Sequence, residues 1–262
     1  MTSIPTTPAP ARPSGGPMRQ TALLAGALYL VTFVTSIPTL KLYAPLRDHA
    51  DFVLGAGSAT GPTWGAFLEI ALALACVGTA VVLFPVAKRQ SERAALGFLA
   101  ARTLEAGLIL VGVVSLLSVL TLRHDVAATA GADAPSLVTA GHTLVAVYDR
   151  TFLLGQSLMP VVSALCLGSV LYRSGLVPRI IPAVGLVGAP LLLASDIAIF
   201  FGAYQQGSAL AGLAALPIAV WEFALGVWLV VKGFRPAPLL TQPGADHDAR
   251  APHLQAAQPA LP

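Results

Sequence analysis

Charged residues are scarce in this chain. Asp, Glu, Lys and Arg make up 10% of its 262 residues, while hydrophobic residues make up 56%. A soluble domain carries about a quarter charged residues, so the composition excludes water as the main solvent of the fold. The formal net charge is +3, without a long run of Lys and Arg and without a basic face interleaved with aromatic residues. We therefore expect no nucleic-acid partner.

Metal-binding and catalytic signatures are also lacking. The two cysteines, Cys76 and Cys166, lie far apart inside apolar segments, so neither has a nearby cysteine with which to form a metal or redox pair. The motifs HExxH, GxSxG, the Walker lysine motif and GxGxxG after a strand are absent. The histidines all fall in predicted connections or in the C-terminal tail, at His49, His124, His142, His247 and His253. We expect no metal and no cofactor, and we favour a function that is not enzymatic.

What the sequence does contain is six apolar segments, each long enough to cross a hydrocarbon layer of about 30 Å, which takes about 20 helical residues. They run approximately over residues 21–40, 64–87, 95–122, 151–172, 180–203 and 208–231. We predict an all-α fold, a polytopic integral membrane bundle of six transmembrane helices in one domain over residues 19–234. Residues 1–18 and 235–262 are rich in Pro and Ala, and we predict that they are disordered tails.

A seventh segment, residues 135–148, has an amphipathic pattern. At helical spacing, one face carries apolar residues and the other carries polar ones, with Leu137, Gly141, Leu144, Val145 and Tyr148 opposite Thr139, His142, Thr143 and Asp149. This pattern is typical of a helix that lies in the membrane interface, or of an extension of the fourth spanning helix beyond the lipid. We favour the interfacial helix.

The distribution of Lys and Arg predicts the orientation. Ten of them lie on one side of the predicted membrane and four on the other, at Arg12, Arg19, Lys88, Arg89, Arg93, Arg173, Arg179, Lys232, Arg235 and Arg250 against Lys41, Arg47, Arg123 and Arg150. Because cytoplasmic loops carry the excess of Lys and Arg, we expect both termini in the cytoplasm. The expected location is the cytoplasmic (inner) membrane of a bacterium, with the lipid bilayer as the surrounding partner.

Five charged residues fall inside the predicted spans. Arg102, Glu105 and Glu222 belong to the cytoplasmic half, and Glu69 and Asp196 belong to the outer half. A charge at such depth costs at least about 2.5–3.5 kcal/mol, so each should face protein or water. Arg102 and Glu105, three residues apart, share a helix face, and we expect Arg102 to contact Glu222 as well.

These charges have two interpretations. In the structural one, Arg102 clamps Glu105 and Glu222, and the outer acids are hydrated or protonated. In the functional one, four acids exceed one cation, so they line a polar cavity that binds a proton, an ion or a polar solute. Glu69 is then the first candidate for proton exchange, with Asp196 as its partner if the second and fifth helices adjoin.

Four stretches of the chain resemble a known family. The sequences VVLFPVAKR (81–89), ALGFLAARTLEAGLILVG (95–112), LYRSGLVPRIIPAVGLVGA (171–189) and WEFALGVWLVVKGF (221–234) are similar to the bacterial membrane proteins called domain of unknown function 4386. The most specific parts are Arg102-x-x-Glu105 and Glu222 followed by residues 232–234. The resemblance covers about residues 19–234 and implies a multi-span bacterial membrane protein. It implies no activity, cofactor or catalytic residue.

Three functions remain open at this point. The leading hypothesis is transport or permeation of a proton, an ion or a small polar solute through the charged interior. The alternatives are a non-catalytic membrane subunit or sensor, and, with less support, a metal-independent lipid-modifying enzyme. A path that reaches both Glu69 and Glu222 would favour transport, whereas a dry bundle with an exposed groove would favour a subunit or sensor.

Overall fold

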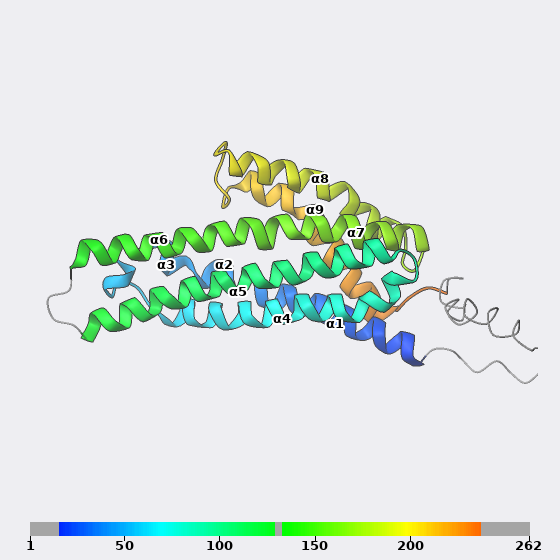
Figure 1. Cartoon of the computed structure of the whole chain (residues 1–262), viewed down its shortest axis with the longest axis horizontal. Coiled ribbons are helices and arrows are strands. Elements are labelled where there is room, and N and C mark those ends of the chain that lie inside the picture. Colours follow the sequence, from blue (N-terminus) through cyan, green and yellow to red (C-terminus); the bar gives the residue numbers. More distant parts are fainter. Residues whose placement is uncertain (1–15, 129–132, 237–262) are drawn as a thin grey trace, which may run out of the picture.

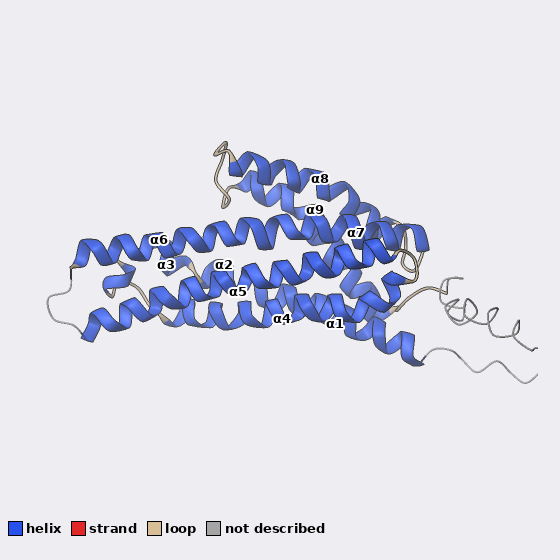
Figure 2. Ribbon diagram, in the orientation of Figure 1, coloured by secondary structure: helices blue, strands red, loops and turns tan. Residues whose placement is uncertain are grey.

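The structure is a computed structural model that describes residues 16–128 and 133–236 (Figure 1). Most of both predicted tails lies outside the described residues. Within the described residues the fold is helical and contains no strand (Figure 2). The long helices are α1 (Gly16–Ser36), α4 (Thr60–Lys88), α5 (Glu92–Ala128), α6 (Ala134–Phe152), α7 (Met159–Ser174), α8 (Ile180–Phe200) and α9 (Ala209–Val231).

Short helices fill two of the connections. After α1, the chain forms α2 (Thr39–Leu42), α3 (Ala44–Asp48) and the single 3-10 turn η1 (Phe52–Leu54), while the π-helix η2 (Leu153–Leu158) joins α6 to α7. Six segments of the described chain are long and apolar enough to span a membrane. The prediction of an all-α polytopic bundle is confirmed, and the protein is a multi-pass membrane protein.

The six spanning helices form a closed ring. Each packs against two neighbours, in the order α1, α4, α5, α7, α8, α9 and back to α1. Both ends of the described chain and the α4–α5 connection lie at one end of this ring, which we call the terminal end (Figure 1). The α8–α9 connection, α2 and α3 lie toward the opposite, or far, end. Side chains from helices that are distant in sequence therefore face one another inside the ring.

The ring closes where α1 meets α9. A Cβ atom on Gly26 would lie 2.7 Å from the backbone oxygen of Gly226, so only glycine allows the two helices to approach this closely. The Arg19 guanidinium donates hydrogen bonds to the carbonyl oxygens of Leu229 and Val230 at 2.9 and 2.7 Å. These carbonyls belong to the last turn of α9, where helical partners are missing. Arg19 thus caps α9 from α1.

The predicted interfacial helix over residues 135–148 is wrong, because this amphipathic segment is part of α6. Helices α6, η2 and α7 form one continuous helix over Ala134–Ser174, so the segment extends the fourth spanning helix instead. The apolar face of α6 packs on α5: Tyr148 shares a core with Leu116 and Val119, and Ser115 Oγ donates to the Leu144 oxygen at 2.6 Å. Hydrophobic periodicity reports which face is covered, not whether lipid or protein covers it.

Helices α5 and α6 run side by side beyond the far end of the ring (Figure 1). The 37 residues of α5 give a length of about 55 Å, which exceeds a hydrocarbon layer of about 30 Å. Arg123 fixes this extension to the loop before α4, because its guanidinium donates to the oxygens of Phe52, Gly55, Ala56 and Gly57. The extension therefore has a defined structure.

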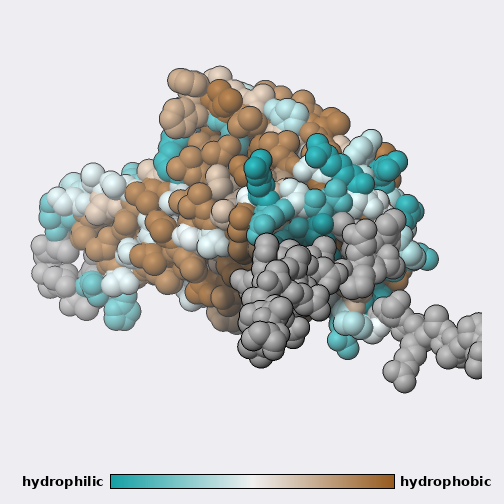
Figure 3. Space-filling view, turned by 45° about the vertical axis from the view of Figure 1, so that its right-hand side comes forward, coloured by the Kyte–Doolittle hydropathy of each residue, from teal (hydrophilic) through white to brown (hydrophobic). Residues whose placement is uncertain are grey.

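The terminal half of the ring is packed with apolar side chains. We call this group the apolar plug and define it by Leu83, Phe98, Leu167, Trp221 and Leu225, which are all at most 1% exposed. On the outside, large hydrophobic side chains are exposed along the helices, and hydrophilic residues gather toward the ends of the bundle (Figure 3). Lipid solvates the flanks of such a surface.

Candidate functional site

Arg102, Glu105 and Glu222 form an ion cluster inside the ring. The cluster lies next to the apolar plug, on its side toward the far end. Arg102 Nη1 donates to Glu105 Oε2 at 2.9 Å, and Arg102 Nη2 donates to Glu222 Oε1 at 2.8 Å. Arg102 is 1% exposed. The structure thus brings together the three residues that the sequence grouped, and the cluster joins α5 to α9 across the interior.

Two further helices enclose this cluster. The Tyr29 ring of α1 lies 5.1 Å from the Arg102 guanidinium carbon, in a cation–π contact. The Cys76 sulfur of α4 lies 3.8 Å from Arg102 Nη1. Arg102 directs two donors at carboxylates, and each carboxylate uses one oxygen on Arg102, which leaves its second oxygen to accept from another donor.

Glu69 of α4 is fully buried. Its Oε1 accepts a hydrogen bond from Tyr148 Oη at 2.7 Å and another from Gln156 Nε2 at 3.3 Å. The second oxygen, Oε2, is buried, and the Tyr43 hydroxyl lies close to this carboxyl group. No cation contacts this carboxyl group among the described residues, so neutral donors hold it in place.

Asp196 of α8 is 5% exposed, and its Oδ1 accepts a 2.6 Å hydrogen bond from Ser157 Oγ. The sequence suggested Asp196 as a partner of Glu69, on the condition that their helices adjoin. In the described structure α4 and α8 are not neighbours in the ring, and η2 stands between the two acids. Adjacent residues of this π-helix, Gln156 and Ser157, instead bond one acid each.

A central cavity of about 220 Å³ lies on the axis of the ring. All six spanning helices contribute to its wall, with Thr32, Cys76, Arg102, Glu105, Gln156, Leu192 and Glu222 among the lining residues. The cavity therefore contains the whole ion cluster. Its wall also contains Gln156, one of the two donors to Glu69, and Ser157, the donor to Asp196, so both outer acids lie behind this wall.

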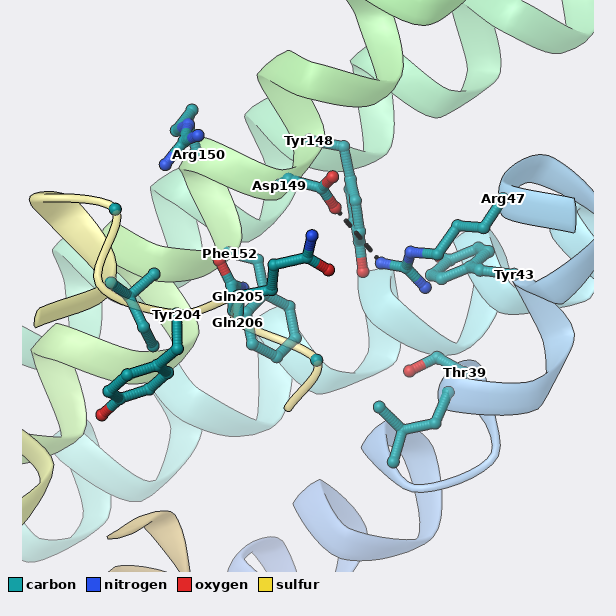
Figure 4. Close-up of a pocket in the computed structure, with 14 residues that line it drawn as sticks. Thr39, Tyr43, Arg47, Tyr148, Asp149, Arg150, Phe152, Tyr204, Gln205 and Gln206 are labelled. Atoms are coloured by element: carbon teal, nitrogen blue, oxygen red, sulfur yellow. Dashed lines mark hydrogen bonds and ion pairs between the residues drawn. The ribbon is translucent and has the colours of Figure 1, made fainter. Parts of the chain in front are cut away.

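A second, larger pocket of about 650 Å³ opens at the far end of the ring, between α2 and α3, α6 and the α8–α9 connection (Figure 4). We call it the outer pocket. The side chains of Arg47 and Asp149 point toward one another there and form an ion pair at 3.2 Å. Tyr43 and Tyr148 form the wall beside this pair.

Phe152, the last residue of α6, lines both the outer pocket and the central cavity. It therefore lies at the boundary between them. Glu69 lies beside the same boundary, because Tyr148 lines the outer pocket and Gln156 lines the central cavity. Glu69 therefore lies between the outer pocket and the central cavity.

Residues 24–233 match the family described as "Domain of unknown function (DUF4386)". The chain belongs to this family. The matched DUF4386 region includes most of α1 and all the other helices of the ring, and so contains both cavities. No curated protein and no solved structure matches the chain. The DUF4386 description assigns no activity, so a function must be argued from the geometry of the site.

The DUF4386 fold also contains functional candidates that sequence reasoning missed, namely Phe152, Ser157, Tyr148 and Tyr43. Gln156 and Ser157 are adjacent polar residues in the fourth apolar segment, and this pair is the signal that could have led to the π-helix. Within residues 16–128 and 133–236, no three His, Cys, Asp or Glu side chains converge on a common point that would hold a metal ion.

Proposed function

We propose that this protein moves a small polar solute, an ion or a proton across the bacterial cytoplasmic membrane, through the central cavity. The observation that carries the proposal is that Phe152 lines both cavities. A solute in the outer pocket is thereby one side chain away from the ion cluster. Charged residues in a membrane interior are costly and mark substrate or ion pathways.

The orientation rests on the Lys and Arg distribution, which puts the terminal end in the cytoplasm. Both ends of the described chain lie at the same end of the ring, which agrees with an even number of spans. The outer pocket then faces the outside, and the apolar plug closes the cytoplasmic half. This arrangement corresponds to the outward-facing form of a carrier. Transport requires a second form in which Leu83, Phe98, Leu167, Trp221 and Leu225 separate.

Glu69 fits a proton-exchange role within this proposal. Its carboxyl group lies between the two spaces and has no cation partner among the described residues, since Tyr148 and Gln156 are its donors. The π-helix is consistent with a functional role at this point, because π-helices occur mostly as single-turn bulges inside α-helices and are frequent at functional sites. A change of register at η2 would change the direction of Gln156 relative to Phe152, which precedes the π-helix.

The direct test is flux in proteoliposomes loaded with a pH-sensitive dye and challenged with a panel of small solutes. The informative variant is Ala219→Phe, which fills the central cavity from α9 without removing a charge. Its matched control is Val220→Phe, on the neighbouring residue that is 47% exposed toward lipid. We expect Ala219→Phe to abolish flux and Val220→Phe to retain it. Wild-type protein that moves no proton and no solute would rule the proposal out.

A sensor is the second candidate, and the packing of the apolar plug favours it. Phe98 and Leu225 are fully buried and Trp221 is 1% exposed, so these side chains pack closely in the cytoplasmic half. A sensor would bind its ligand from the outside and pass on a change of shape. Binding without flux in the same vesicles would separate a sensor from a carrier.

A further inference from the structure

We propose that the central cavity binds a small organic cation, and that the ammonium group of this ligand donates hydrogen bonds to Glu105 and Glu222. The inference rests on the proposed function, since it names the class of solute that the route would carry. It also stands if the protein is a sensor, because it concerns binding.

The charge balance of the cavity favours a cation. Arg102 is the one cation among its described lining residues, and it faces two carboxylates, Glu105 and Glu222. Glu69 and Asp196 lie directly behind Gln156 and Ser157, which are also in the wall. Such an excess of acids in a medium of low dielectric attracts positive charge and repels anions.

The hydrogen-bonding capacity of the wall agrees with this charge balance. Arg102 occupies one oxygen of each carboxylate in the cluster. The second oxygen of Glu105 and of Glu222 can accept from an ammonium group, which carries three donors and no acceptor. Glu222 is the more accessible of the two, since its side chain is 12% exposed and that of Glu105 is 6% exposed.

The size and lining of the cavity favour an organic ligand over a bare metal ion. A volume of about 220 Å³ exceeds the roughly 150 Å³ that holds a benzene molecule. Most of the wall is apolar, with Phe33, Pro160 and Ile218 among its residues. A few polar groups in an apolar wall are typical of small-molecule sites, whereas hard cations require shells of six or more oxygen ligands.

The space in front of Glu222 results from small side chains on its own helix. Ala219 and Ala215 precede Glu222 by three and seven residues, so all three share one face of α9, and all three line the cavity. Phe33 and Phe152 contribute aromatic rings to the same wall. Aromatic faces attract ammonium groups, so the wall supplies both halves of a recognition site for an organic cation.

The test is direct binding to the full chain in nanodiscs made of phosphatidylglycerol, measured by calorimetry. Three aromatic probes of similar size differ in charge: benzylammonium is a cation, benzyl alcohol is neutral and benzoate is an anion. We expect benzylammonium to bind at least about tenfold more tightly than either other probe, as a charge-assisted hydrogen bond implies. Equal affinities, tighter binding of benzoate, or no binding of any probe would overturn the inference.

Two variants connect this preference to the cavity. Ala219→Phe should abolish benzylammonium binding, while Val220→Phe should leave it unchanged. Glu222→Gln should reduce the preference over benzyl alcohol to less than about threefold. Unchanged binding in both Ala219→Phe and Glu222→Gln would place the probe elsewhere and overturn the inference. Ala219→Phe keeps the ion cluster intact, so it remains informative if Glu222→Gln fails to fold.

The source of the ammonium group can be distinguished in the same assay. Nanodiscs that contain phosphatidylethanolamine lower the apparent affinity for benzylammonium if the headgroup of this lipid occupies the site. An unchanged affinity assigns the site to a free amine. Failure of the proposed function is separately visible: a protein that binds benzylammonium but moves no proton and no solute in vesicles refutes transport and leaves the binding site in place.

Discussion

The Tyr148 hydroxyl donates a 2.7 Å hydrogen bond to Glu69, and this contact joins α6 to α4 between the outer pocket and the central cavity. Glu69 is fully buried and Tyr148 is 3% exposed. The bond therefore joins two groups that are largely shielded from water. When a buried donor is removed, its acceptor stays buried without a hydrogen bond, and the protein loses the free energy that desolvating this acceptor costs.

Tyr148→Phe should destabilise the protein by about 1–3 kcal/mol, because Glu69 then keeps Gln156 as its main donor. Thermal unfolding in detergent measures the change. The matched control is Tyr172→Phe, a tyrosine that is 43% exposed, which should leave stability nearly unchanged. Equal losses in both variants would show that the hydroxyl of Tyr148 has no special role.

Arg102→Ala should be more damaging than the double variant Arg102→Ala with Glu222→Gln. The single change leaves two buried carboxylates without their cation, at a cost of about 3–5 kcal/mol. The added Glu222→Gln change removes one of these charges and recovers part of the loss. Denaturant or thermal unfolding of the four proteins in the double-mutant cycle gives the coupling energy. A double variant less stable than Arg102→Ala would contradict the clamp.

Gly26→Ala should weaken the closure of the ring. The added methyl group would lie 2.7 Å from the Gly226 oxygen and 2.8 Å from the Val230 nitrogen, and both are backbone atoms that cannot move alone. We expect a loss of about 1–3 kcal/mol, as for other cases of overpacking.

Gly107→Ala is the control for that prediction, since nothing lies within 4 Å of its added Cβ. This helical position should gain up to about 1 kcal/mol from the better helix propensity of alanine. Both proteins can be compared by thermal unfolding. A stabilising Gly26→Ala would mean that α1 and α9 do not approach so closely.

The orientation predicts which surface positions react with a membrane-impermeant thiol reagent. A cysteine at Gln90, in the α4–α5 connection, should be protected in intact cells because the Lys and Arg distribution predicts that this connection faces the cytoplasm. A cysteine at Thr139, exposed on the far-end extension, should react. The parent chain reports the background from Cys76 and Cys166. The reverse labelling pattern would invert the topology and with it the direction of the outer pocket.

The ion cluster could be predicted from the sequence because neither argument for it needs the order of the helices in space. One argument uses spacing within a single helix, and the other uses the small number of available cations. Arg102 and Glu105 stand three residues apart on a helix, and an acid as deep as Glu222 has one cation available in the spans. The six spans follow from length and apolarity alone. These features depend on helix geometry and on the cost of burying charge, which are the same in any membrane bundle.

The surroundings of Glu69 depend on helix order in space, which the sequence does not encode locally. The amphipathic pattern predicts an interfacial helix for Tyr148, because an apolar face toward α5 and one toward lipid have the same periodicity. Between Tyr148 and Ser157 the π-helix changes the angle at which successive side chains leave the helix axis. A pattern based on an ideal α-helix therefore predicts the wrong side-chain directions for the residues after it. The role of Phe152 depends on the shapes of two cavities.

The closure of the ring by Arg19 has a consequence for biosynthesis. Its acceptors, the carbonyls of Leu229 and Val230, belong to the last spanning helix, whereas Arg19 belongs to the first. Five helices must therefore be inserted before α9, the second neighbour of α1, exists. Until then Arg102 lacks Glu222 and faces an incomplete wall. A nascent chain shortened before α9 leaves a charged, open arc in the bilayer, a form suited to removal by membrane proteases.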